Sequence, residues 1–458
     1  MTAWYDKATF YHMYPLGMTG SPFANPYPVS DGAADGTNRD VSADSRMDEL
    51  MLWIPYLESL HISAIYIGPL FESSTHGYDT RDFRLIDRRL GTNGSFRSFV
   101  DCCHEHGIRV VVDGVFNHTG REFFAFRNLQ AHRDQSPYAG WYRNVNFGWG
   151  SPLGDSFGYE SWHGIWELPC LNHGNPEVRN YLLDTVRFWV QEFDIDGIRL
   201  DCAGDLSFEF MQELRRLANE IKPEFWLMGE VIHGEYARWV NPQMLHSVTN
   251  YEMHKSIYSA HNDHNYFELA HNVRRLEAVG RDLYTFVDNH DEDRIASKLN
   301  NLANLFPVYQ LLFTLPGIPS VYYGSEWGIE GKRSRTSDEV LRPALNLSDM
   351  LGKAPELASH IAALGKIHTE NDAFHNGSYK ELLLTNRQYA FSRSGEHGTV
   401  ISAVNNDEQP ASISIPLPCA ASDVVSLLPG EIPFSLENGR LSVTLPANGG
   451  AIFKLQEV

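Results

Sequence analysis

Two charged residues interrupt an apolar run near the middle of this sequence. In GIRLD, residues 197–201, Arg199 and Asp201 alternate with apolar side chains, and a spacing of two places both charges on the same face of a strand. Burying an arginine and a carboxylate is costly unless the groups pair or take part in chemistry. The pattern therefore indicates a candidate site rather than an ordinary core strand.

Other apolar runs end in acids, histidines or amides in the same way. These residues are Asp113 near the end of the run 109–115 with Asn117 and His118 after it, Glu230 at the end of 225–231, and His290 and Asp291 after 283–289. A single aspartate at a strand end usually caps a helix or solvates a loop. Four strand ends that each supply an acid are better explained by one shared site.

The elements that would position these residues alternate between strands and helices. Strands are predicted at 9–16, 64–70, 109–115, 196–202, 225–231, 247–252, 283–289 and 317–324, and helical patterns at 46–60, 96–103, 177–192, 207–221 and 302–315. Eight strands with intervening helices predict an α/β fold of the closed (β/α)8 TIM barrel type. Barrel enzymes hold their catalytic groups at the carboxyl ends of the strands.

Two regions depart from this alternation and predict smaller domains. We expect a barrel from 1–117 and 173–370, an insertion domain at 118–172 with little helical periodicity, and a C-terminal antiparallel β-sandwich at 373–458. The insertion carries eight aromatic residues: Trp141, Tyr142, Phe147, Trp149, Phe157, Tyr159, Trp162 and Trp166. They would either wall a binding site or form the small core of the insertion.

Composition excludes several classes of partner. The 458 residues carry a formal net charge of −21 without a long basic run, which argues against nucleic acid and anionic membranes. No run of about 18 apolar residues is present to span a membrane. The N-terminus lacks a signal-peptide pattern, and the five cysteines form no disulfide framework. A cytoplasmic protein is expected, and the oligomeric state is not predicted.

Three carboxylates with an arginine and two histidines suit glycoside hydrolysis. One acid protonates the leaving oxygen, a carboxylate attacks or stabilises the oxocarbenium-like centre, and other polar groups bind sugar hydroxyls. The sequence contains no Walker motif, no G-x-G-x-x-G, no HExxH and no serine-centred elbow.

Four stretches resemble the signature regions of the alpha-amylase family of glycoside hydrolases. They are DGVFNH (113–118), GIRLDCAGD (197–205), MGEV (228–231) and FVDNHD (286–291), supported by HGYDTRDF (76–83), LPCLN (168–172) and GIPSVYYGSE (317–326). The resemblance implies that Asp201 is the nucleophile, Glu230 the general acid/base and Asp291 the transition-state stabiliser. It also implies a retaining mechanism, with nucleophile and acid/base about 5–5.5 Å apart.

The resemblance assigns the neighbouring residues to the substrate. Tyr78 would stack on the sugar ring before the scissile bond, and His118 and His290 would hydrogen-bond its hydroxyls. Arg199 would keep Asp201 ionised at neutral pH, and carboxylates near Glu230 would raise its pKa. Asp113 and Asn117 are interpreted as braces of the loop after the third strand.

Departures from the family pattern narrow the substrate. Gly204 and Asp205 stand where many alpha-amylases carry Lys-His, and LDCAGDLSFEF and LPCLN are more similar to cyclomaltodextrinases, neopullulanases and maltogenic amylases. Those relatives usually carry an N-terminal β domain that helps to form a dimer. This sequence enters its barrel within about ten residues, so that domain is not expected, and the dimer it helps to form is not predicted.

No cofactor or metal is predicted. The acidic stretch DGAADGTNRD (31–40) lacks the EF-hand pattern and is interpreted as a turn, so structural calcium has no support from the sequence. His261, His264 and His271 have no zinc-ligand spacing. Cys202, next to the candidate nucleophile, is interpreted as a buried thiol without a chemical role.

The leading hypothesis is therefore a hydrolase of α-1,4-linked maltooligosaccharides, cyclodextrins or both. An exo-acting α-glucosidase or a transglycosylase on short α-glucans is the first alternative. The second is an inactive barrel that serves as a binding subunit.

Overall fold

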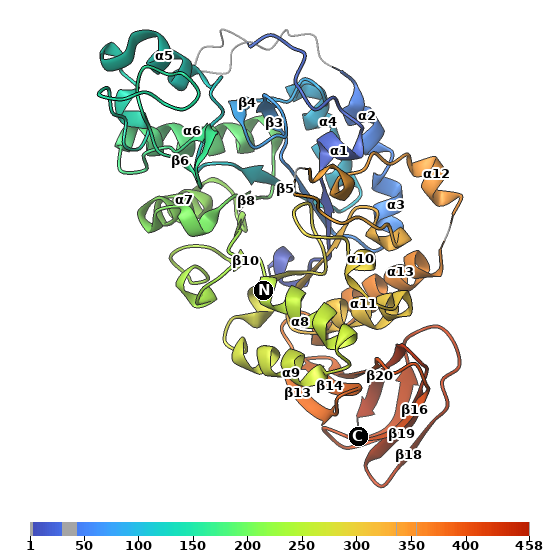
Figure 1. Ribbon diagram of the computed structural model, residues 1–458. Coiled ribbons are helices and arrows are strands. Elements are labelled where there is room, and N and C mark those ends of the chain that lie inside the picture. Colours follow the sequence, from blue (N-terminus) through green and yellow to red (C-terminus); the bar gives the residue numbers. More distant parts are fainter. Residues whose placement is uncertain (1–2, 30–43, 336, 354, 458) are drawn as a thin grey trace.

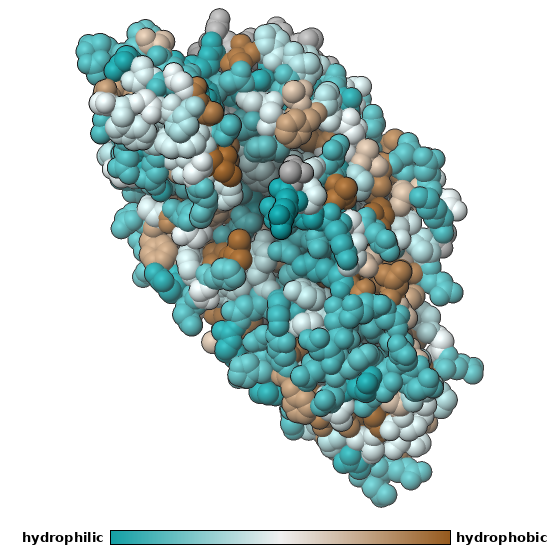
Figure 2. All heavy atoms as spheres, in the orientation of Figure 1, coloured by the Kyte–Doolittle hydropathy of each residue, from teal (hydrophilic) through white to brown (hydrophobic). Residues whose placement is uncertain are grey.

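The computed structural model describes residues 3–29, 44–335, 337–353 and 355–457. The stretch 31–40, interpreted above as a turn, lies outside these ranges. The chain forms a barrel with an insertion at one end of the molecule and a β domain at the other (Figure 1). Hydrophilic residues cover most of the face in Figure 2, and apolar residues form small groups on it. None of the helices in the described ranges has the length and apolar character of a membrane span.

Eight parallel strands form the barrel, and each lies within one of the eight predicted runs. They are β1 (Phe10–Met13), β2 (Ala64–Ile67), β5 (Arg109–Gly114), β8 (Gly197–Leu200), β9 (Trp226–Gly229), β10 (Ser247–Val248), β11 (Tyr284–Phe286) and β12 (Ile318–Tyr322). Their order in the sheet is β10-β9-β8-β5-β2-β1-β12-β11. A parallel bridge from Thr249, directly after β10, to Tyr284 of β11 closes the circle, which confirms the predicted barrel.

Helices surround the barrel, and their caps and buried faces explain where they form. They are α1 (Pro15–Met18), α2 (Arg46–Met51), α3 (Ile54–Ser59), α4 (Asn93–Glu105), α6 (Pro176–Phe193), α7 (Phe208–Ile221), α8 (Tyr251–Asn262), α9 (Tyr266–Arg275), α10 (Ile295–Lys298), α11 (Leu305–Thr314), α12 (Leu347–Leu351) and α13 (Glu356–Glu370). In α6, Asn175 caps the first turn, and the buried Leu182, Val186 and Trp189 recur at helical spacing. The single helix predicted at 46–60 is two helices, because Pro55 has no amide hydrogen with which to continue α2.

A packed aromatic layer fills the barrel beneath the carboxyl ends of the strands. It contains Phe10, Tyr66, Val111, Trp226, Met228, Tyr284, Phe286 and Ile318. The ring of Phe10 lies 5.0 Å from that of Trp226 and 5.4 Å from that of Tyr284, centroid to centroid. Burial of such large rings stabilises the barrel and gives the polar groups above them a rigid floor.

The insertion packs into the main core of the molecule. It contains α5 (Phe124–His132) and a hairpin of β6 (Ser161–Trp162) and β7 (Ile165–Pro169); β3 (Phe71–Ser73) and β4 (Thr80–Ile86) form a second hairpin. Helix α5 was not predicted; it forms because Phe126 and Leu129 are buried. Of the eight aromatic residues, four are buried (Trp141, Tyr142, Phe157 and Tyr159), whereas Trp149 is exposed. These four are core residues, but their cluster is shared with the barrel and is not separate.

Two antiparallel sheets form the C-terminal domain, as predicted. One sheet has the order β13 (Ser378–Leu384), β14 (Gln388–Gly395), β15 (Gly398–Asn405), β20 (Gly449–Glu457) and β17 (Ala421–Ser426); the other has β16 (Ala411–Pro416), β19 (Arg440–Leu445) and β18 (Phe434–Glu437). Ile401 and Phe453 of the first sheet and Leu441 of the second belong to one buried cluster. Gln310 of α11 joins this domain to the barrel by donating to Ser402 Oγ at 3.0 Å and to Ala403 O at 3.1 Å.

One buried acid links the stability of the barrel to pH. Glu326 follows β12, is fully buried, and accepts a 2.6 Å hydrogen bond from the hydroxyl of Tyr11. Burial raises the pKa of Glu326 from 4.5 to about 7, although Tyr11 and Arg294 oppose the shift. Because the folded-state pKa is above the unfolded one, its contribution to stability is present at low pH and is lost as pH rises from about 4.5 to about 7.

We therefore predict that Glu326→Gln removes this loss. The amide stays neutral and keeps an oxygen to accept from Tyr11, so the variant should gain stability relative to the parent as pH rises, by about 3 kcal/mol between pH 5 and pH 8. Urea unfolding of both proteins at these two pH values measures the difference. A gap between the proteins that does not change with pH would contradict the assignment.

Candidate active site

Arg199 lies at the centre of the candidate active site. Its Nη1 is 2.9 Å from Asp113 Oδ1 and 2.9 Å from Asp201 Oδ1, and its Nη2 is 2.9 Å from Glu230 Oε2. At most 10% of any of these four side chains is exposed. One buried cation thus holds three carboxylates, two of which are the predicted nucleophile and acid/base.

Adjacent barrel strands bring these groups together. Asp113 of β5 is the direct register partner of Arg199 in β8. Just beyond the strand ends, Asp201 N donates to Gly114 O at 3.1 Å and Glu230 N donates to Leu200 O at 2.9 Å. Each acid is therefore fixed by the same hydrogen-bond ladder that holds the strands.

Asp201 and Glu230 lie close together on the same arginine. An oxygen of each lies within 4.8 Å of the other. Burial raises the pKa of Asp201 to about 8; Arg199 opposes this shift, while Glu230 and Asp113 add to it. Arg199 therefore favours the ionised form of Asp201, but its one positive charge, divided among three carboxylates, does not outweigh burial.

Asp291 lies in the same site and is held from two sides. Its Oδ2 is 3.0 Å from His290 Nε2, and its Oδ1 is 2.9 Å from Arg342 Nη2. Burial alone would raise the pKa of Asp291, but His290 and Arg342 outweigh it and hold the pKa well below its ordinary value. Asp291 is therefore ionised, as a stabiliser of positive charge must be.

The three predicted sugar-binding residues are brought together beside these acids. The hydroxyl of Tyr78 is hydrogen-bonded to His290 Nε2, and the two rings stack with centroids 5.7 Å apart. His118 Nε2 is 3.1 Å from Tyr78 O, and its Nδ1 is 3.3 Å from Asn117 Nδ2. Burial lowers the pKa of His118 to about 3, so it is neutral. A bond from His118 to a sugar hydroxyl would have to replace one of these contacts.

Sequence reasoning missed two residues of the site. Asp113 was interpreted as a loop brace, yet besides Arg199 it accepts from the hydroxyls of Tyr66 at 2.8 Å and Tyr78 at 3.3 Å. Its place at a strand end was a signal for this role. Arg342 belongs to the loop after β12, where no strand or helix pattern marks it.

The insertion reaches the site through one aromatic residue. Trp162 Nε1 donates to Asp205 Oδ2 at 3.1 Å, and the Trp162 ring lies 5.7 Å from that of His118. His163 Nε2 is also 3.4 Å from Asp205 Oδ2. Asp205, one of the two residues that stand where many alpha-amylases carry Lys-His, thus anchors the tip of the β6–β7 hairpin next to His118.

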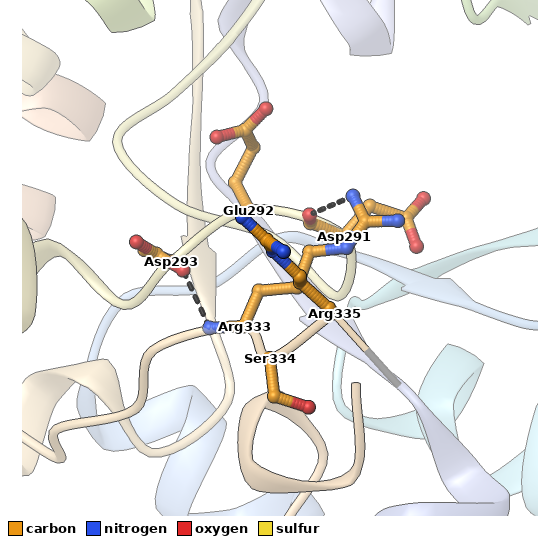
Figure 3. Close-up of a pocket in the computed structure, with 6 residues that line it drawn as sticks. All are labelled: Asp291, Glu292, Asp293, Arg333, Ser334 and Arg335. Atoms are coloured by element: carbon orange, nitrogen blue, oxygen red, sulfur yellow. Dashed lines mark hydrogen bonds between the residues drawn. The ribbon is translucent and has the colours of Figure 1, made fainter. Parts of the chain in front are cut away.

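A pocket of about 360 Å³ adjoins Asp291 (Figure 3). Its lining consists of Asp291, Glu292, Asp293, Arg333, Ser334 and Arg335. The amide of Arg333 donates to Asp293 Oδ1 at 2.7 Å, and its Nη1 lies 3.4 Å from Asp291 O. The segments after β11 and β12 therefore meet at Asp291.

A thiol also lies among the acids. In the described ranges, Asp201, Cys202 and Glu230 form a group whose ligand-type atoms are within 4.8 Å of one another. Arg199 already neutralises part of this charge, and burial next to carboxylates raises the pKa of Cys202 far above its ordinary value. The protonated thiol and the guanidinium make the group a poor metal site.

The histidines set aside as metal ligands make structural contacts. His261 Nδ1 is 2.7 Å from Ile257 O, and His264 Nδ1 is 2.8 Å from Asn406 O. Both contacts involve backbone carbonyls, which supports the structural interpretation of these two residues.

Comparison with known proteins gives one consistent picture. The family model described as "Alpha amylase, catalytic domain" matches residues 47–347. A maltogenic alpha-amylase of Bacillus acidopullulyticus is 30% identical and covers 99% of this chain, which spans 78% of that protein. A cyclomaltodextrinase of Thermoanaerobacter pseudethanolicus is 32% identical over 78% of this chain and 62% of that protein. The solved structure of the Nostoc punctiforme debranching enzyme, soaked with acarbose, superposes with a TM-score of 0.82 at 27% identity, covering 99% of both chains.

The raised pKa of Asp201 predicts the shape of the pH profile. Because the predicted nucleophile must be ionised to attack, kcat/KM should rise with pH up to about 8, where Asp201 loses its proton. Asp113→Asn removes a charge that raises the pKa of Asp201 and leaves more of Arg199 to Asp201 and Glu230. The acid limb should then move down by about one pH unit.

Asp205→Asn is the matched control for this shift, because Asp205 lies at the same site but is not among the groups that shift the pKa of Asp201. Its acid limb should stay where it is in the parent. An unmoved acid limb in Asp113→Asn would show that the titrating group is not Asp201.

Proposed function

Because this chain belongs to the alpha-amylase family of glycoside hydrolases, we propose that it cleaves α-1,4-glucosidic bonds of maltooligosaccharides and cyclodextrins with retention of anomeric configuration. The observation that carries the mechanism is the approach of Asp201 and Glu230 oxygens to within 4.8 Å. Retaining glycosidases separate these groups by about 5–5.5 Å, whereas inverting enzymes need about 6.5–9.5 Å to admit water.

The proposed reaction has two displacements. Glu230 first gives its proton to the glycosidic oxygen while an Asp201 oxygen attacks the anomeric carbon, so the bond to the leaving sugar breaks and a glycosyl ester forms. Glu230 then takes a proton from water, whose oxygen attacks the same carbon and releases Asp201. Arg199 contacts both carboxylates, so it can stabilise each as charge moves between them.

Asp291 and its neighbours bind the sugar that reacts. The ionised Asp291 faces the positive charge that develops at the anomeric centre. Tyr78 offers a ring face to the apolar side of the sugar. The ring nitrogen His290 Nδ1, buried and without a partner among the described residues, is available for a hydroxyl.

The leaving side of the site sets the balance between water and a sugar acceptor. Trp162, held by Asp205, presents a ring on which a departing or incoming sugar can stack. Water attack gives hydrolysis, and attack by a sugar hydroxyl gives the transglycosylation alternative. Similarity to the relatives named maltogenic alpha-amylase and cyclomaltodextrinase supports short chains and rings as the proposed substrates of this chain.

A second candidate is cleavage of α-1,6 branches. It is favoured by the structure named as a debranching enzyme, which matches this chain over 99% of both lengths. The two relatives named maltogenic alpha-amylase and cyclomaltodextrinase cover 99% and 78% of this chain, with higher identity, so α-1,4 cleavage remains the first proposal.

The proposed setting is the cytoplasm. All five cysteines (Cys102, Cys103, Cys170, Cys202 and Cys419) are free thiols in the structure. A reducing compartment keeps thiols in this state.

The proposed roles of the acids predict loss of activity with a retained fold. Glu230→Gln and Asp201→Asn should each lower kcat at least about 10³-fold, because one removes the acid and the other the nucleophile. Proton NMR of the first product released from maltoheptaose should show the α-anomer. An initial β-anomer, or a variant with parental activity, would contradict the mechanism. A parent protein without measurable activity would favour the inactive-barrel alternative.

A product time course with β-cyclodextrin, maltoheptaose and panose separates the substrate proposals. We expect ring opening and release of short maltooligosaccharides, with Asp201→Asn as the blank. An untouched ring with stepwise loss of glucose from the linear chain would favour the α-glucosidase alternative. Cleavage of the α-1,6 bond of panose ahead of its α-1,4 bond would favour debranching.

A further inference from the structure

We propose that Arg342 is the positioning residue of Asp291. The two other acids each directly follow a strand, Asp201 after β8 and Glu230 after β9, and their amides extend the ladder. Asp291 instead lies five residues beyond Phe286, the last residue of β11. No strand hydrogen bond orients its carboxylate, which depends instead on the contacts of Oδ2 with His290 and of Oδ1 with Arg342.

The guanidinium of Arg342 binds the side chain of Asp291 and the backbone of the preceding residue. Its Nη2 is 2.9 Å from Asp291 Oδ1, and its Nε donates to the carbonyl oxygen of the preceding residue, His290, at 3.0 Å. A fork that bonds a carboxylate and the adjacent carbonyl fixes both the position and the rotation of the side chain.

Arg342 is itself held in place. Only 13% of its side chain is exposed. Its guanidinium lies 4.6 Å from the centroid of the Tyr14 ring, and its Nη1 is 3.4 Å from the hydroxyl of the same residue. Asp338 accepts from Arg342 Nη2 at 3.3 Å and pairs with Arg333 Nε at 3.1 Å. The fork therefore has little freedom to follow a displaced Asp291.

Arg333 reinforces the same segment through its backbone and side chain. Its amide binds Asp293 Oδ1 and its Nη1 binds Asp291 O, as the dashed lines in Figure 3 show. Asp338 thus links two arginines that contact residues 290, 291 and 293. The loop after β12 replaces the strand ladder that Asp291 lacks.

This inference rests on the proposed function, in which Asp291 stabilises the transition state. Misplacing a catalytic group by about 1 Å can cost about 100-fold in rate. A residue that acts through Asp291 should affect kcat for every substrate. A residue that only binds a distant sugar unit should affect KM, and only for long substrates.

The test compares Arg342→Gln and Arg342→Lys with the parent on maltoheptaose and on an aryl α-maltoside. We expect kcat to fall about 100-fold on both substrates with KM little changed. Arg342→Lys should stay impaired, because an ammonium group cannot make the fork. Arg335→Gln is the control, since Arg335 lines the same pocket but makes no described contact with the Asp291 carboxylate.

Chemical rescue gives a readout that a merely structural role would not move. Added guanidinium ion should partly restore kcat of Arg342→Ala and leave the parent and Arg335→Gln unchanged, and circular dichroism checks that each variant is folded. Folded variants with parental kcat, or with a loss confined to KM on maltoheptaose, would overturn the inference. A parent protein inactive on all α-glucans would instead refute the proposed function.

Discussion

One buried guanidinium is the constraint on which the site depends. Arg199 is 3% exposed and faces three carboxylates, those of Asp113, Asp201 and Glu230, each at 2.9 Å. Without the cation, three buried negative charges would repel one another in a medium that screens them poorly. With it, the cluster still carries excess negative charge, and the pKa of Asp201 is raised.

The barrel stabilises this cluster by fixing its members through strand register and through ladder hydrogen bonds. Strand register sets Asp113 against Arg199, and ladder hydrogen bonds continue to Asp201 and Glu230. An aromatic layer beneath them resists any shift of the strand ends. Asp291 is beyond the reach of its strand and relies on the loop after β12. The insertion contributes His118 at its start and Trp162, bound by Asp205, at the hairpin tip.

Much of the fold could be predicted because buried parallel strands leave unbroken apolar runs, and the groups of the site follow those runs directly. The predicted acids and their neighbours meet as expected. What the sequence could not show depends on pairing in space. The division of Arg199 among three carboxylates needs the strand register, and the role of Asp113 follows from it. Arg342 is distant from any periodic pattern, so its contact with Asp291 could not be predicted. Nothing in the sequence distinguishes Trp162 from the seven other aromatic residues of the insertion, and only its hydrogen bond to Asp205 does so. The two helices at 46–59 and helix α5 depend on one proline and on local burial.

The central claim is that Asp201 forms a covalent bond to the sugar while Glu230 moves the proton. The most direct measurement is to incubate the protein with a fluorinated α-glucosyl fluoride, whose ester intermediate hydrolyses slowly, and to locate the added mass by peptide mass spectrometry. We expect one glycosyl group per chain, bound to the carboxylate of Asp201, and none on the variant Asp201→Asn. A glycosyl group on Glu230 or Asp291, or turnover without any trapped ester, would contradict it.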